Sequence, residues 1–187
     1  MMKKLVMLVF LLIALSGVVA AAEMEKGTVA VMPYFNSTEE TKGYIGKTVN
    51  GGYTDYFAKA GFRVVSQEAV KVAMQNAGYD AGDQMLPEKE VMAKIAQETG
   101  ADYVVAMELA GLHSTRHESY FSTKVNTKCK LKYHFYSQKA DKLTPFQTTS
   151  VNNNKAVLVG MRSYKSSMIA ALKDAMNKGN EKIKGLL

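Results

Sequence analysis

The stretch TVAVMPYF, residues 28–35, decides the fold of this chain. Its small, β-branched and then larger apolar residues form a nearly continuous hydrophobic run, which is typical of a strand buried on both faces of a sheet. Pro33 lacks a backbone N–H and cannot donate a ladder hydrogen bond, so regular pairing should stop or become irregular there. The sequence therefore predicts a first strand that is covered by helices.

Residues 1–22 have the pattern of a signal peptide that is removed on export: a positive start, an apolar core and small residues for cleavage after Ala22 or Ala20. The apolar core is shorter than the ~20 residues that a membrane span needs, and an uncleaved anchor is the alternative. The only cysteine, Cys129, lies far from the leader and cannot carry a lipoprotein's diacylglycerol. We therefore expect an exported protein that is soluble in the periplasm or extracytoplasmic envelope after cleavage.

The mature chain, residues 23–187, is long enough for a single domain with its own core. Removing the leader takes away two lysines and leaves 22 basic and 17 acidic residues, a net charge of +5. A lone cysteine cannot form an internal disulfide, so burial must stabilise the domain. The basicity favours an anionic envelope protein or polymer as partner and allows peripheral contact with a membrane.

Helices and strands alternate in the first half of the chain. Apolar residues at helical spacing occupy residues 45–60, where Gly51 and Gly52 predict a kink or break. Residues 62–65 are typical of a second strand. Ser66 is typical of the N-cap residue of a helix and predicts that the next helix begins there. After a loop, Pro87 predicts the first turn of another helix. That helix should end at a glycine and lead into a third strand. We expect the second helix to end at Gly78 and the third at Gly100. The third strand should occupy residues 101–107 and continue toward Leu112.

The second half has the clearest strand signal, because apolar and polar residues alternate strictly over residues 124–135. Residues 138–141 predict a turn and residues 143–151 a weaker return strand. The three asparagines at 152–154 predict a second turn before a short apolar run. A final helix should pack on the sheet through one apolar stripe. The stripe consists of Tyr164, Met168, Leu172, Met176 and Ile183.

The predicted order is strand, helix, strand, helix, helix, strand, strand, strand, helix. This order indicates an α/β (α+β) sandwich, in which a mixed sheet of about five strands has helices packed on it.

Motifs for catalysis, cofactors and metals are weak. Residues 46–48 read Gly-Lys-Thr, but Thr41 stands where a phosphate loop needs its first glycine, which favours an ordinary helix turn. His113 and His117 have the spacing of two metal ligands on a helix, yet their segment resembles a strand end and loop, which favours plain loop histidines. Cys129 lies on the apolar face of the best strand and should be a buried thiol. We expect no enzyme, no cofactor and no nucleic-acid partner.

A row of lysines is the one feature of the sequence that indicates a binding surface. Lys124, Lys128, Lys130 and Lys132 share one strand face, which could meet phosphates or an acidic polymer. The alternative, which we favour at this point, is that lysines on an exposed strand prevent edge-to-edge association.

Three segments together resemble one envelope family. Residues 29–36, Val-Ala-Val-Met-Pro-Tyr-Phe-Asn, are similar to the first strand of the TolB amino-terminal domain and curli-secretion lipoprotein (CsgG) group. Residues 61–66 and 99–105 resemble the next two elements of that group. The resemblance covers about residues 28–107 and implies an envelope protein that works by contacts, like assembly components and activators of penicillin-binding proteins. The chain lacks a lipobox cysteine, a propeller and clear pore hairpins.

These observations favour an exported, non-catalytic binding or assembly module of the bacterial cell envelope. Two alternatives remain open. One is a small-ligand-binding or hydrolytic enzyme, in which His113, His117 and a carboxylate would converge in a deep pocket. The other is a membrane-associated oligomer or pore component, since alternating strands can also span membranes. The partner and the oligomeric state do not follow from the sequence.

Overall fold

The computed structural model describes residues 26–80, 82, 85–119, 122–157 and 164–187. The predicted signal peptide, with cleavage after Ala20 or Ala22, lies outside the described residues. The described strands are β1 (Thr28–Val31), β2 (Phe35–Asn36), β3 (Arg63–Val64), β4 (Tyr103–Ser119), β5 (Ser122–Ser137) and β6 (Lys142–Val157). The described helices are α2 (Gly43–Val49), the π-helical turn η1 (Asn50–Thr54), α3 (Asp55–Lys59), α4 (Gln67–Asn76), α5 (Lys89–Thr99) and α6 (Tyr164–Lys184).

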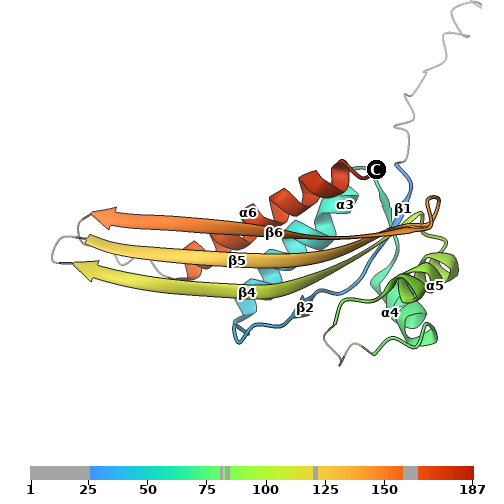
Figure 1. Cartoon of the computed structure of the whole chain (residues 1–187), viewed down its shortest axis with the longest axis horizontal. Helices are drawn as coiled ribbons and strands as arrows, with labels where there is room; N and C mark the ends of the chain where they lie inside the picture. The colour runs from blue at the N-terminus through green and yellow to red at the C-terminus, as the bar shows by residue number, and fades with distance from the viewer. Residues whose placement is uncertain (1–25, 81, 83–84, 120–121, 158–163) are drawn as a thin grey trace, which may run out of the picture.

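The strands form one mixed sheet in the order β3-β1-β4-β5-β6, with the short β2 also beside β4. Strand β1 pairs in parallel with β3 and with β4, and β2 pairs in parallel with β4, whereas β4, β5 and β6 form an antiparallel set. Figure 1 shows these three long strands running side by side along the longest axis of the molecule. The structure confirms the predicted mixed α/β (α+β) sandwich and its element order.

The first predicted strand is divided at the place that Pro33 indicates. Strand β1 ends at Val31, and β2 begins only at Phe35. Between them the Met32 amide still donates to the Val105 carbonyl at 2.9 Å, so the chain stays beside β4. All four residues of β1 are buried, as expected for a strand covered on both faces.

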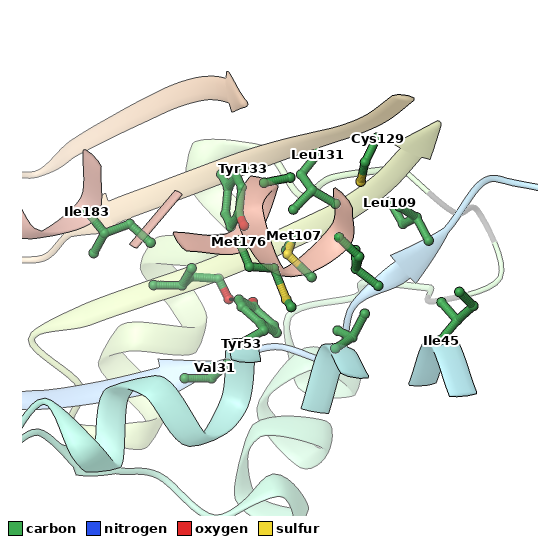
Figure 2. Packing of buried hydrophobic residues seen from close by; sticks show 14 of the residues in the cluster. Val31, Ile45, Tyr53, Met107, Leu109, Cys129, Leu131, Tyr133, Met176 and Ile183 are labelled. Carbon is green, nitrogen blue, oxygen red and sulfur yellow. Dashed lines mark hydrogen bonds between the residues drawn. The ribbon is translucent and has the colours of Figure 1, made fainter. Parts of the chain in front are cut away.

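Two apolar layers cover the sheet unequally. On one face, α2, η1, α3 and α6 pack along nearly its whole length, with Tyr53, Met107, Tyr133 and Met176 pointing toward one another between them (Figure 2). On the other face, α4 and α5 cover only the end near β1, where the cluster includes Ala106 on β4 and further residues of β1 and β5. The rest of that second face has no helix over it in the described part of the chain (Figure 1).

Several local predictions are confirmed by the backbone. Ser66 caps α4, because its side chain accepts a hydrogen bond from the Ala69 amide at 3.3 Å. Gly100 ends α5 in the left-handed conformation, with φ of 64°. The predicted kink at Gly51 and Gly52 is the π-helical turn η1. Pro87 lies just before Glu88, the N-cap of α5, rather than inside its first turn.

Two predicted loops are wrong, because both belong to long strands. Residues 113–118 continue β4 and pair with β5, and residues 152–154 continue β6 instead of turning. Long-range pairing decides both cases. Asn153 lies opposite Asn126 on β5, and the Asn152 side chain accepts a hydrogen bond from Ser167 of α6 at 3.1 Å. The turn preference of asparagine is weaker than a complete ladder of strand hydrogen bonds.

Candidate functional site

The uncovered part of the sheet carries a surface that we call the basic face. It consists of Lys124, Lys128, Lys130 and Lys132 on β5 and of His113 and His117 on β4. Alternation along β5 produces the face, because Val125, Thr127, Cys129, Leu131 and Tyr133 are buried toward α6. The predicted lysine row therefore does share one side of a strand.

The register brings the two histidines to the lysines. His113 of β4 lies opposite Lys128, and His117 lies opposite Lys124. An irregularity between Leu109 and Gly111 allows this alignment, since the extra residue there shifts the register of all that follows on β4. The sequence analysis placed the two histidines in a loop and not beside the lysines, although the alternation of Leu112, Ser114 and Arg116 with His113, Thr115 and His117 has the period of two of a strand.

Strand β5 lies in the middle of the antiparallel set, which overturns the favoured interpretation of its lysines. It pairs with β4 on one side and with β6 on the other over nearly its whole length. A central strand has no free edge to protect, so these lysines do not serve to prevent edge-to-edge association. They form a cationic surface on the face of the sheet.

One acidic residue partly neutralises this surface. Glu108, with a side chain 12% exposed, lies opposite Lys132, and their charged groups are 3.1 Å apart. No described carboxylate lies within ion-pair distance of Lys124, Lys128 or Lys130. The three lysines thus leave positive charge that an anionic partner could neutralise.

The opposite side of the same strands is fixed rigidly to α6. A chain of hydroxyl groups runs from Ser114 on β4 to Thr127 on β5 at 2.6 Å and from there to Ser167 on α6 at 2.7 Å. On β6, the Thr148 hydroxyl donates to the Ala175 carbonyl of α6 at 2.9 Å. Thr127 and Ser167 are fully buried, so these bonds form away from water and hold the basic face in place.

Among the described residues, the remaining motifs do not come together as a metal site. Among the described residues, no group of three or more histidine, cysteine, aspartate or glutamate side chains could hold a metal ion. His134 is separate from the other histidines, since its Nδ1 atom lies 2.8 Å from the Pro87 carbonyl oxygen. Residues 46–48 lie inside α2 and not in a strand-to-helix loop.

The enzymatic alternative requires His113 and His117 to share a pocket with a carboxylate. His113 does line a groove of about 750 Å³ together with Glu39 and Glu40, but His117 does not. The two histidines lie four residues apart on an extended strand, which separates their Cα atoms by about 13 Å. The expected convergence is therefore not formed in this groove.

Cys129 is buried on the α6 side of β5, as predicted. Burial raises the pKa of its thiol from 9.0 to about 12, because the low-dielectric interior disfavours the thiolate. The folded state thus holds this proton more tightly than the unfolded state does. The contribution of Cys129 to the free energy of unfolding is unchanged below about pH 9 and falls as the pH rises from about 9 toward 12.

We therefore expect Cys129 to resist alkylation in the folded protein. At about pH 8 a rise of the thiol pKa from 9.0 to about 12 makes the reactive thiolate about a thousandfold rarer. Mass spectrometry after iodoacetamide treatment should show modification in concentrated guanidinium chloride and almost none in buffer. Equal rates in the two solutions would contradict the buried position.

Comparison with known proteins gives a fold but no family. No protein-family model and no curated protein sequence matches the chain. It is similar to the structure of hypothetical protein CT253 from Chlamydia trachomatis, at 12% identity over 86% of this chain and 96% of that chain, with a TM-score of 0.55. It is similar at a TM-score of 0.47 to lipoprotein GNA1162 from Neisseria meningitidis, at 14% identity over 84% of this chain and 98% of that chain. The C-terminal domain of LpoB from Escherichia coli has 15% identity over 71% of this chain and 87% of that chain, with a TM-score of 0.44.

The likeness to the Chlamydia protein supports the fold alone. The TolB and CsgG resemblance stays a prediction that rests on residues 29–36, 61–66 and 99–105. Among the described helices, none has both the length and the apolar composition needed to cross a membrane.

Proposed function

We propose that this protein is an exported, non-catalytic binding or assembly module of the bacterial cell envelope that acts through contacts with a protein or polymer. The observation that carries the proposal is the basic face: a part of the sheet that is packed on α6 on its opposite side and has no helix over it in the described chain. The secretion pattern of residues 1–22 supports the location in the envelope.

The arrangement suits recognition through a preformed surface. The side chains that support the face are buried, whereas Lys124, Lys128 and Lys132 are exposed. A partner that binds a rigid strand surface orders few groups of this protein, so little of the binding energy is lost to conformational entropy. Positive charge on the face favours an acidic protein surface or an anionic polymer and raises the association rate.

We expect charge reversal on this face to abolish capture of the partner. The mature protein, immobilised and exposed to envelope extract, should retain a specific component that elutes at raised salt concentration. The triple variant Lys124→Glu, Lys128→Glu and Lys130→Glu should retain at least about tenfold less of this component, because its negative charges would repel an anionic partner. Quantitative mass spectrometry of the eluates measures the difference.

A matched control separates the face from net charge. The variant Lys59→Glu, Lys71→Glu and Lys94→Glu reverses three exposed lysines on α3, α4 and α5 and should retain the partner normally. Far-UV circular dichroism checks that both variants are folded. Equal loss in the two variants, or recovery of nothing specific by the unmodified protein at any salt concentration, would refute the proposal.

A further inference from the structure

The outer half of β4 has an edge without a neighbouring strand in the described part of the chain. Strands β1 and β2 pair with the inner half of β4, and the last ladder contact is the Ser37 amide donating to the Leu109 carbonyl at 3.1 Å. Within the described residues, residues 111–118 pair only with β5. A row of backbone donors and acceptors at this edge is thus available for another strand.

On the opposite side of the antiparallel set, the edge of β6 is covered over residues 145–149. Lys178 of α6 donates to the Thr149 carbonyl at 3.3 Å, and Lys182 donates to the Gln147 carbonyl at 3.0 Å. Pro145 near the start of β6 removes one further donor. The two segments therefore differ, since lysines cover the carbonyls of Gln147 and Thr149 on β6 and no described side chain does the same for residues 111–118 of β4.

A groove runs beside the unprotected edge. It measures about 750 Å³ and is lined by residues 110–114 of β4 on one side and by Met168 of α6. Residues 37–42 line the other side and include Glu39 and the ion pair of Glu40 with Lys42 at 3.1 Å. Its position continues the line of β2, which already pairs with β4 in parallel. A segment that entered the groove would extend an existing ladder rather than begin a new one.

The directions of the β4 backbone groups follow from these contacts. The Leu109 carbonyl points outward to Ser37, and the Thr149 and Gln147 carbonyls point outward from β6. Because the extra residue at 110 shifts the alternation, the backbone N–H and C=O groups of Leu112, Ser114 and Arg116 point to the free edge.

The side chain of Arg116 also has an unused donor at this edge. Its buried Nε atom has no acceptor among the described residues.

The side chains at the edge define the chemistry of the segment. His113, Thr115 and His117 lie on the basic face, with Lys124 and Lys128 one strand further in. Leu112 and Ser114 lie on the side toward α6. Side chains on neighbouring strands meet at about 5 Å, so every second residue of an added strand would lie beside the basic face. Acidic residues at those positions would be favoured.

We propose that the outer edge of β4 binds, by strand addition, an extended protein segment with acidic residues at alternate positions. The segment pairs with the backbone of residues 111–118 and directs its carboxylates over the basic face. Main-chain hydrogen bonds hold the segment, and the alternating charge selects it. The inference rests on the proposed function, because it names the partner chemistry of the same surface.

The probe is a fluorescent nine-residue peptide that alternates glutamate with threonine, titrated into the mature protein and followed by anisotropy. A peptide with the same composition but consecutive glutamates should bind about tenfold more weakly, because half of its carboxylates would face α6. Two N-methylated peptides test the ladder. Methylation of the amides that face β4 should abolish binding, whereas methylation of the alternate amides should leave it unchanged.

On the protein, Ser114→Pro removes the outward amide N–H, and Ser114→Ala is its matched control. Both lose the hydroxyl contact with Thr127, but only Ser114→Pro should lose peptide binding, by about tenfold or more. Heteronuclear NMR spectra of the two variants check that each is folded. Equal binding by both N-methylated peptides and by both variants would overturn strand addition and reduce the interaction to charge alone.

Two further outcomes also overturn the inference. If sedimentation shows a dimer that Ser114→Pro disrupts and the peptide does not displace, the edge is occupied by a second copy of this chain. If the peptide does not bind while capture from envelope extract still depends on Lys124, Lys128 and Lys130, the proposed function stands and strand addition fails. Displacement of the captured envelope component by the peptide supports both.

Discussion

Substitution of Gly179 by alanine is expected to lower the free energy of unfolding by about 1–3 kcal/mol. Gly179 lies in α6 where the helix crosses β5, and a Cβ atom there would lie 2.6 Å from both Cζ and Oη of Tyr133. The Tyr133 ring cannot move aside easily. It is 1% exposed and stacks on Phe146 with 4.9 Å between ring centroids. The clash should exceed the ~1 kcal/mol that alanine gains over glycine as a helix former.

Urea unfolding followed by circular dichroism measures the loss, and Gly52→Ala is the control. A Cβ at Gly52 would also be too close to a side chain, but the atom it would meet is the terminal methyl group of Met176. A flexible methionine can choose another rotamer at little cost. Gly52→Ala should therefore be close to neutral. If the two variants are equally stable, α6 does not pack on Tyr133 as closely as described.

The sequence predicts elements well where the signal is local. Ser66 and Gly100 carry the backbone preferences of helix ends, and the alternation over residues 124–135 follows directly from the two faces of β5. Prediction from the sequence fails where strand pairing between distant segments determines the local structure. Residues 152–154 have the composition of a turn, yet they pair with β5 and continue a strand, and Asn152 also accepts a hydrogen bond from the Ser167 hydroxyl. Such contacts cannot be predicted from the sequence of one segment considered alone.

The same distinction applies to the candidate site. The lysines of β5 could be found from their spacing, because side chains two residues apart share a face of any strand. Whether these lysines protect a sheet edge or form a surface on the sheet could not be predicted, because this depends on the strand order β4-β5-β6, which makes β5 central. The partial cover by α4 and α5 and the free outer edge of β4 likewise arise only when distant segments come together.

Removal of the two lysines that cover β6 is expected to make the protein self-associate. In the variant Lys178→Ala with Lys182→Ala, the Thr149 and Gln147 carbonyls lose the ammonium groups at 3.3 Å and 3.0 Å. Val151, just beyond them on β6, is a large apolar residue with 54% of its surface exposed. An edge with free acceptors and an exposed valine is a template for pairing with another chain. Sedimentation velocity should show association that increases with protein concentration, where the unmodified protein shows less.

Two controls assign the effect to the carbonyl contacts. Asp174→Ala removes the 2.7 Å ion pair of Lys178 but leaves its ammonium group free to bind the Thr149 carbonyl, so it should not promote association. Lys178→Arg with Lys182→Arg keeps cationic donors at both positions and should behave like the unmodified protein. If the arginine variant associates as much as the alanine variant does, the loss of the hydrogen-bond donors is not what exposes the edge of β6. Because β6 lies at the far side of the sheet from the free edge of β4, the alanine variant should still bind the alternating acidic peptide. The two segments lie on opposite sides of the antiparallel set: lysines of α6 cover the Gln147 and Thr149 carbonyls of β6, whereas no described side chain covers the backbone of residues 111–118 of β4.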